Sequence, residues 1–203
     1  MNFAERFASK DFRDHSTAVV FLRGEGVSGE VHLPGLLEIC NKIDIRKQNK
    51  SEREAIFIVL SARAMGEIIQ LVGFQEQNEL HRGCLEWIEG LLSSGEKDSL
   101  YAGIWALGDL GVPPNTTIDR LYQIAIGERL ENRTAQISPR GLAFRVIAKL
   151  DRQIAKTLTE RECCREYLQA VDQWSAYYKG KYPENLRIRD ELIEEARWIH
   201  DEI

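Results

Sequence analysis

The sequence lacks the features that mark membrane and exported proteins. No stretch approaches the roughly 18 consecutive apolar residues that a membrane-spanning helix needs. The opening segment, MNFAERFASKDFRDH, alternates charged and apolar side chains and contains no apolar signal core. We therefore expect a cytoplasmic protein that has no membrane partner.

The sequence also lacks the residue spacings of common metal and catalytic sites. Its four cysteines contain no C-x-x-C pair, and its four histidines show no H-x-x-x-H or H-E-x-x-H spacing. No G-x-S-x-G motif and no Cys/His arrangement for nucleophilic catalysis stands out. We predict four buried free thiols in a reducing compartment, no metal, no cofactor and no catalytic residue.

An excess of positive charge is absent as well. The chain has 27 Lys and Arg residues against 32 Asp and Glu residues, a net charge of −5, whereas nucleic-acid affinity depends on a positive surface. We therefore expect no nucleic-acid partner. The hydrophobic fraction of 43% and the length of 203 residues suit a single folded domain over residues 1–203.

Three glycines, Gly24, Gly26 and Gly29, match the G-x-G-x-x-G pattern of phosphate-binding loops. A dinucleotide site requires a helix that begins directly after the glycines, so that its N-terminus meets the pyrophosphate. Here residues 30–34 intervene, and the lysine strand, catalytic loop and Asp-Phe-Gly motif of a kinase are absent from the sequence. We predict a hairpin or loop here that does not bind phosphate.

What the sequence does contain is a repeated five-residue pattern. Segments 64–68, 106–110 and 146–150 each have the order small apolar, large apolar, small, charged, large apolar, and they begin at intervals of 42 and 40 residues. A period of roughly 40 residues is typical of stacked helical pairs. The pattern therefore predicts an all-α fold in which neighbouring pairs bury one continuous core.

Local signals divide the chain into three such pairs, at about 51–94, 98–130 and 139–180. Ser51-x-x-Glu54 and Ser138-Pro139 are helix-start signals, and Asp98 can cap the helix that carries Trp105. Three glycines are predicted to end helices: Gly73, Gly95 and Gly111.

The two ends of the chain differ from these pairs. Residues 1–48 form a predicted N-terminal cap region, in which Thr17–Leu22 and Val27–Leu33 have the β-branched composition of a β-hairpin. A helix from Pro34 to about Gln48 is expected to follow. Residues 184–203 are charge-rich with helically spaced apolar positions, which predicts a C-terminal capping helix.

The segment Ser99–Gly111, SLYAGIWALGDLG, resembles the first helix of a HEAT-type repeat. The matching positions of the small-x-x-x-Ala-Leu-Gly-x-Leu-Gly pattern are Ala102, Ala106, Leu107, Gly108, Leu110 and Gly111. The match is best in residues 99–130 and extends over about 51–180, although the third copy has Lys149 where the second has Asp109. The resemblance implies a HEAT-like α-solenoid that acts as a protein-binding scaffold; an irregular all-α bundle remains the alternative.

Trp105 and Asp109, spaced i, i+4 on one predicted helix, project from the same face. Some HEAT-like proteins are alkylpurine DNA glycosylases, which hold a damaged nucleotide with tryptophans and an aspartate on a concave surface. The resemblance therefore leaves a second hypothesis, a glycosylase or nucleic-acid-binding module that uses these two residues. The acidic charge balance opposes it. The HEAT motif itself implies that Asp109 occupies a solvated position in the turn next to the loop and that Trp105 packs on the adjacent repeat.

The first hypothesis is a non-catalytic scaffold, adaptor or inhibitor that binds another protein through a concave helical surface. In a HEAT-like stack the second helix of each pair lines that surface, which singles out four polar residues as binding candidates: Arg120, Gln123, Gln169 and Gln173. Because the chain is acidic, a basic partner would associate faster through charge complementarity. The identity of the partner, the pathway and the oligomeric state stay open.

Overall fold

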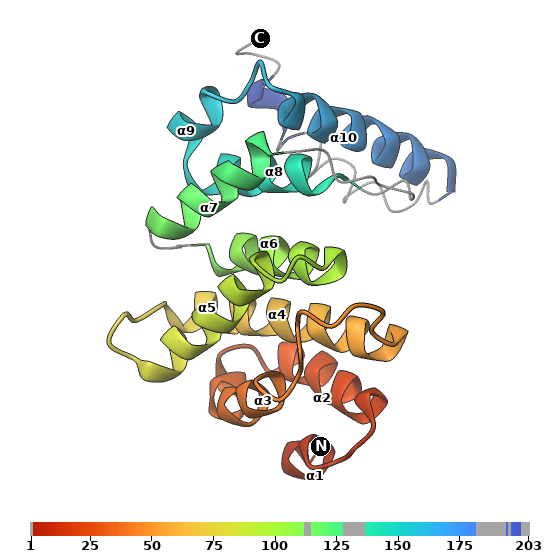
Figure 1. Cartoon of the computed structure of the whole chain (residues 1–203), viewed down its shortest axis with the longest axis vertical. Coiled ribbons are helices and arrows are strands. Elements are labelled where there is room, and N and C mark those ends of the chain that lie inside the picture. Colours follow the sequence, from red (N-terminus) through yellow and green to blue (C-terminus); the bar gives the residue numbers. More distant parts are fainter. Residues whose placement is uncertain (1, 112–114, 128–136, 182–193, 195, 200–203) are drawn as a thin grey trace. The chain divides into compact units, whose positions relative to one another are not determined.

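The computed structural model describes residues 2–111, 115–127, 137–181, 194 and 196–199 (Figure 1). All regular secondary structure in these ranges is helical, and no strand occurs among them. The prediction of an all-α protein is therefore confirmed. The chain divides into two compact units, residues 1–117 and 118–203, and each is described here by itself. The expectation of a single domain stays a prediction.

The helices of unit 1 are, in chain order, α1 (Phe3–Phe7), α2 (Phe12–Gly24), the 3-10 helix η1 (Gly26–His32), α3 (Leu33–Cys40), α4 (Glu52–Val72), α5 (Glu79–Leu92) and α6 (Lys97–Leu110). Helix α7 (Asn115–Ile126) crosses the boundary between the units. Unit 2 continues with α8 (Pro139–Leu150), α9 (Arg152–Lys156) and α10 (Glu162–Lys181).

Several predicted helix ends are confirmed. The Ser51 hydroxyl accepts the N–H of Glu54 at 3.2 Å at the start of α4, and Ser138 caps α8 with Pro139 in its first turn. Gly73 and Gly111 end α4 and α6 with φ of +84° and +78°, a region that favours glycine.

The cap of α6 differs from the prediction. Glu96 takes this position instead of Asp98, and its carboxylate accepts the N–H groups of Asp98 at 3.1 Å and Ser99 at 2.8 Å. The ammonium group of Lys50, whose side chain is buried, lies 3.6 Å from the same carboxylate. Asp98 lies in the first turn of α6, where a negative charge is still favourable.

The substitution Glu96→Gln is expected to lower the free energy of unfolding by about 1 kcal/mol at neutral pH. Burial opposes ionisation of Glu96, but its bonds to Ser99 and Asp98 and the charge of Lys50 outweigh this and hold its pKa below the ordinary 4.5. A lowered pKa in the folded state provides stability above pH 4.5 that is lost as the pH falls through the folded value. Urea unfolding of both proteins between neutral and acidic pH measures the difference, which should shrink below pH 4.5; a constant difference would contradict this assignment.

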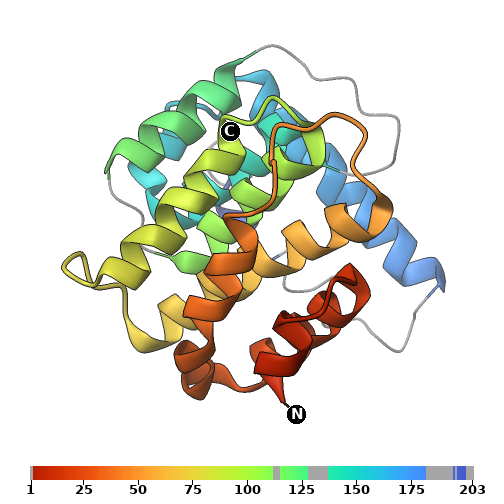
Figure 2. The same cartoon turned by 60° about the horizontal axis from the view of Figure 1, so that its bottom comes forward.

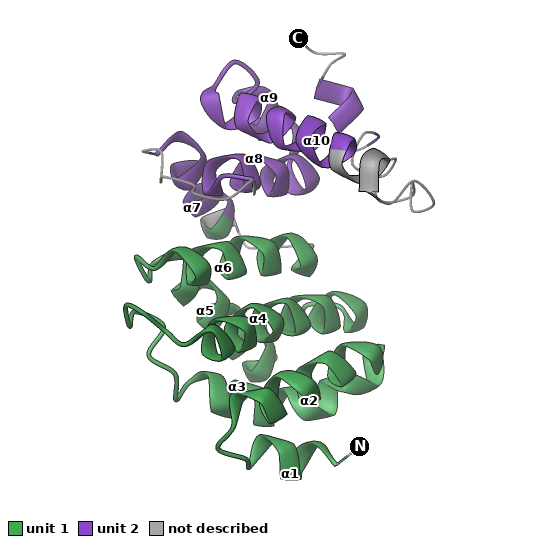
Figure 3. Cartoon of the chain, turned by 90° about the vertical axis from the view of Figure 1, so that its right-hand side faces the viewer, with its two compact units in different colours: residues 1–117 green, residues 118–203 purple. Residues whose placement is uncertain are grey.

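In unit 1, helix α4 packs between α2 and α6, and α3 and α5 pack against each other beside this layer (Figures 1 and 2). Figure 3 shows α2, α4 and α6 as successive helices of the unit. The core is mainly apolar, with fully buried large side chains that include Leu22, Phe57, Met65, Ile68 and Ile88.

The first two copies of the repeated pattern meet where α4 packs on α6. A Cβ atom added at Gly66 would lie 2.5 Å from the carbonyl oxygen of Ala106, a distance that side-chain carbons do not adopt. Gly66 is the small residue of the first copy, and Ala106 begins the second. The small residues of the pattern therefore allow the backbones of two helices to approach closely.

The predicted β-hairpin is wrong. Residues 17–22 lie inside α2, and residues 27–32 belong to η1. Although Thr17–Phe21 is rich in strand-forming residues, Ala18, Val19 and Leu22 are buried at helical spacing as α2 packs on α4. Burial at this packing surface overrides the local preference for a strand.

Two other predicted helices differ in extent or lie outside the described residues. Helix α3 ends at Cys40 instead of near Gln48, and turns follow it. Most of the predicted capping helix at 184–203 falls outside the described residues, although 194 and 196–199 are helical. Ala196 and Ile199 are buried there.

In unit 2, helix α8 packs on α10 and on α9. Phe144 of α8 and Tyr167 of α10 are fully buried, and their ring centroids lie 5.8 Å apart. The third copy of the repeated pattern, residues 146–150, lies in the last turns of α8, where Val146 and Ile147 are buried and Lys149 is exposed. Its apolar positions thus contribute to the core of this unit.

Helix α4 is the one helix of the described residues that is long and apolar enough to cross a membrane. Half of its most apolar window is buried inside the structure. A core helix enclosed on several sides has the same composition, so length and hydropathy do not assign α4 to a membrane.

Candidate functional site

The four residues predicted to bind a partner are all exposed. Arg120 and Gln123 lie one turn apart on α7, opposite the buried Leu121 and Ala125. Gln169 and Gln173 lie one turn apart on α10. Exposure is what a binding role requires, and the role itself stays a prediction.

Trp105 and Asp109, the residues of the second hypothesis, both contact Arg63 of α4. The Nε of Arg63 donates to Asp109 Oδ2 at 2.8 Å, and the guanidinium carbon lies 5.5 Å from the centre of the Trp105 ring. Trp105 is half-buried, and the Asp109 side chain is only 16% exposed, so the expectation of a solvated Asp109 is wrong. The Asp109 carboxylate is therefore engaged by a cation of the neighbouring helix.

These contacts continue onto α2. Arg23 donates to both carboxylate oxygens of Glu67 on α4, with Nε to Oε2 at 2.6 Å, and Arg63 lies 3.4 Å from Oε1 of the same carboxylate. The hydrogen bond with Glu67 raises the pKa of Arg23 above its ordinary value. Arg23, Glu67, Arg63 and Asp109 thus form a charged ladder that joins α2, α4 and α6.

The charged ladder has two cations and two carboxylates, so its formal charge is balanced. Glu67 and Asp109 occupy the charged position of the first and second copies of the repeated pattern. Sequence reasoning missed Arg23 and Arg63 as partners of these carboxylates. The i, i+4 spacing of Arg63 and Glu67 on one helix is a signal that could have drawn attention to Arg63.

Replacing Arg63 with methionine is expected to lower the free energy of unfolding by about 1 kcal/mol, since Asp109 loses its hydrogen-bonded cation while solvent still reaches the site. Lys42→Met removes an ion pair with Glu38 in which both side chains are about 70% exposed, so this control should leave stability unchanged. Urea unfolding measures both variants. Equal stability of Arg63→Met and wild type would show that the charged ladder does not stabilise the fold.

The cysteines are all free and buried, as predicted. Burial raises the pKa of the Cys84 thiol to about 12 and that of Cys164 to about 11, and it raises the pKa values of Cys40 and Cys163 as well. Because the thiolate is the reactive form, these thiols are poor nucleophiles in the folded protein. They contribute to packing.

The two buried histidines connect segments of unit 1. The N–H of Gln75 donates to Nδ1 of His81 at 3.1 Å, which leaves Nε2 to donate to Glu30 at 3.0 Å. His15 donates from Nε2 to the carbonyl of Ser9 at 2.8 Å and packs against the Phe57 ring. Among the described residues, no group of three His, Cys, Asp or Glu side chains could hold a metal ion.

Packing explains one of the three glycines at residues 24–29, since an added Cβ would meet close neighbours at Gly29 but would meet none within 4 Å at Gly24. A Cβ at Gly29 would lie 3.0 Å from the carbonyl oxygen of Leu22 and 3.1 Å from the side chain of Ile68. Gly29 therefore allows η1 to lie directly on α2 and α4. Gly26 and Gly29 lie inside η1, and residues 30–32 separate Gly29 from the start of α3, so the glycines do not form the loop that places a phosphate on a helix N-terminus.

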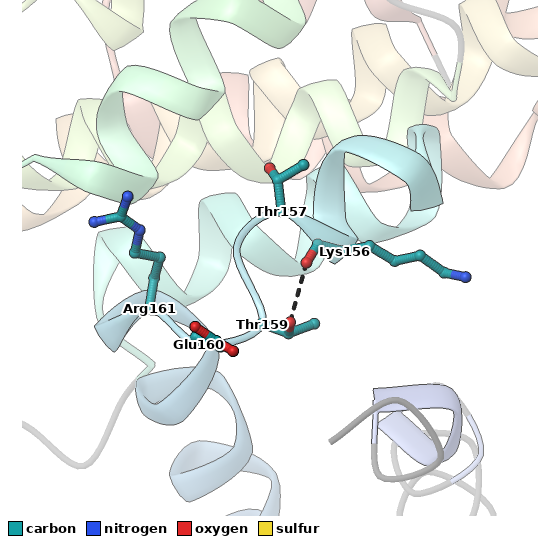
Figure 4. Close-up of a pocket in the computed structure, with 5 residues that line it drawn as sticks. All are labelled: Lys156, Thr157, Thr159, Glu160 and Arg161. Carbon is teal, nitrogen blue, oxygen red and sulfur yellow. Dashed lines mark hydrogen bonds between the residues drawn. The ribbon is translucent and has the colours of Figure 1, made fainter.

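A polar depression of about 360 Å³ lies in the turn between α9 and α10 (Figure 4). Five residues line it: Lys156, Thr157, Thr159, Glu160 and Arg161. Both threonine hydroxyls donate to backbone carbonyls, at 2.7 and 3.0 Å. No lining side chain is both charged and buried, so the depression provides no desolvated group that would select a ligand.

Comparison with protein-family models, curated proteins and solved structures finds no match to this chain. Its function is therefore inferred from its own residues.

Proposed function

We propose that this chain is a non-catalytic, HEAT-like α-solenoid that binds another protein as an adaptor or inhibitor. The observation that carries this proposal is that the residues of the repeated pattern hold neighbouring helices together. Gly66 and Ala106 bring α4 and α6 into backbone contact, and Glu67 and Asp109 join neighbouring helices through Arg63. Repeats whose motif serves stacking leave their outer surfaces for binding.

The binding surface in this proposal consists of Arg120 and Gln123 on α7 with Gln169 and Gln173 on α10. Exposed polar side chains at successive turns present hydrogen-bonding groups without losing core packing. The net charge of −5 favours a basic partner, because opposite charges accelerate encounter and disfavour acidic competitors.

Affinity capture from an extract of the native host tests the proposal. The full chain serves as bait beside Arg120→Glu/Gln173→Glu, and Arg13→Glu/Gln153→Glu is a control with the same substitutions at other exposed positions. A partner that is retained by wild type and the control but reduced about tenfold by the surface variant supports the assignment. Equal retention by both variants removes the proposed surface, and failure to recover any partner counts against a binding scaffold.

The alternative, an alkylpurine DNA glycosylase or nucleic-acid-binding module, has less support. A glycosylase of this kind would use Asp109 to stabilise positive charge on the substrate, yet the Asp109 carboxylate already neutralises Arg63. Titration of labelled duplex DNA at low salt compares wild type with Asp109→Asn. We expect no binding by either protein; binding by wild type that Asp109→Asn weakens would favour the alternative.

A further inference from the structure

The turn between α4 and α5, residues 73–78, is anchored by the buried imidazole of His81 (Figures 1 and 2). His81 lies in the first turn of α5, and its side chain is 1% exposed. In the part of the chain that the structure describes, one backbone N–H of residues 74–77 donates to another protein group. It is that of Gln75, which donates to Nδ1 of His81 at 3.1 Å. Phe74 stacks on the same imidazole, with ring centroids 6.1 Å apart, so both contacts of this turn converge on His81.

These contacts fix the protonation state of His81. A backbone N–H can only donate, so Nδ1 of His81 must accept with its lone pair. The ring proton therefore lies on Nε2, which donates to Oε1 of Glu30 on η1 at 3.0 Å. Both hydrogen bonds exist together only when the imidazole is neutral and carries its proton on Nε2.

A second proton on His81 would have to bind at Nδ1. There it would point at the N–H of Gln75, so that one donor would face another and the hydrogen bond would be lost. Nε2 would keep its contact with Glu30, which would become an ion pair with the imidazolium. Histidine is the side chain whose charge ordinarily changes between about pH 5 and pH 8. Acidification in this range therefore breaks the contact with the turn and preserves the contact with η1.

The surroundings of His81 contain one charged group in contact with the ring, the carboxylate of Glu30. Helices α3, α4 and α6 also pack on α5, and no charged side chain of their described residues is hydrogen-bonded or ion-paired with His81. Three charged side chains close to it in sequence are exposed: Glu76, Glu79 and Arg82. Cys84, one turn further along α5, stays neutral because burial raises its pKa to about 12.

We propose that His81 acts as a pH-sensitive switch that controls the turn between α4 and α5. Neutral His81 holds Gln75, and protonated His81 releases it. Opening of the turn lets water reach the N–H of Gln75 and the new N–H of His81, which would otherwise be buried without acceptors. Gln75 is exposed, so its release disturbs no core packing. This switch does not depend on the proposed function and involves no residue of the surface on α7 and α10.

Amide hydrogen exchange of the full chain, followed by NMR spectroscopy, tests the proposal. The protection of the Gln75 N–H, corrected for the intrinsic pH dependence of exchange, should fall about tenfold between about pH 7.5 and pH 5. The ring-nitrogen chemical shifts of His81 report its protonation over the same range. The N–H of Ile68, in the buried part of α4, should keep its protection, because the opening is local.

Two variants and a matched control assign the effect to His81. His81→Gln removes the titrating ring and keeps a side-chain oxygen that can accept from Gln75, so protection should no longer depend on pH. Glu30→Gln removes the charge that stabilises the imidazolium, so the loss of protection should move to lower pH by about one unit; this variant provides a separate test if His81→Gln does not fold. His32→Gln is the control, because His32 packs on the Phe3 ring and should leave the pH dependence of Gln75 unchanged.

Four results would overturn the proposal. The first is protection of Gln75 in wild type that does not change with pH, and the second is a fall in protection that persists in His81→Gln. The third is a fall that disappears in His32→Gln, since another histidine would then be responsible. The fourth is an equal loss of protection at Gln75 and Ile68, which would show general acid unfolding instead of local release.

Discussion

Replacing Glu166 with alanine is expected to lower the free energy of unfolding by about 3 kcal/mol. Arg140 on α8 donates to both carboxylate oxygens of Glu166 on α10, and the two side chains are only 14% and 12% exposed. Ser138, the cap of α8, also donates to Glu166. The substitution therefore leaves a buried guanidinium and a hydroxyl without their shared acceptor.

Arg140 cannot avoid this cost by losing its proton. Its hydrogen bond with Glu166 raises the pKa of Arg140 above an already high value, and a guanidinium that loses its partner stays charged at neutral pH. The helical circular dichroism signal followed during urea unfolding measures the effect. Glu162→Ala is the control, because Glu162 and Arg165 form an exposed pair and such pairs contribute little.

A double variant distinguishes the effect of an unpaired charge on stability from the effect of lost packing contacts. Arg140→Met/Glu166→Leu removes both charges together, so it should be less destabilised than Glu166→Ala alone. Stability of Glu166→Ala close to that of wild type would show that the Arg140–Glu166 ion pair does not stabilise the packing of α8 on α10.

Gly66→Ala is expected to lower the free energy of unfolding by about 2 kcal/mol. In an open helix this substitution would instead stabilise by up to about 1 kcal/mol, since alanine favours the helix. Here the added carbon would lie 2.5 Å from the Ala106 carbonyl oxygen and 3.3 Å from the Leu110 nitrogen. Both atoms are backbone, so α4 and α6 must separate.

Gly90→Ala on α5 is the matched control. Its added carbon would meet only the end of the Ile45 side chain, at 3.4 Å, so we expect an unchanged or slightly raised stability. Urea unfolding of the two variants measures whether each substitution lowers or raises the free energy of unfolding. A Gly66→Ala protein as stable as wild type would show that the repeated pattern does not control the packing of α4 on α6.

Sequence reasoning predicted the features that depend on neighbours along the chain. Ser51 and Ser138 cap helices because their hydroxyls reach N–H groups three residues later, and Gly73 and Gly111 end helices because of their own backbone freedom. The repeated pattern also placed its three copies on helices. Each of these features is determined by a few neighbouring residues of the sequence.

The errors and omissions come from contacts between distant segments. Residues 17–22 have the composition of a strand, but packing of α2 on α4, some 40 residues away, favours a helix. Arg23 and Glu67 are 44 residues apart, and Arg63 and Asp109 are 46 apart, so no local motif contains either pair.

A double-mutant cycle between Arg63 and Asp109 tests most directly whether the charged positions of the repeat join neighbouring helices. The free energies of unfolding of wild type, Arg63→Met, Asp109→Leu and the double variant give the coupling energy between the two side chains. The 2.8 Å contact predicts a coupling of about 1 kcal/mol, with the double variant more stable than the sum of the single losses implies. Additive losses, with a coupling near zero, would contradict the structural role given to Asp109 and return that residue to the candidates for chemistry.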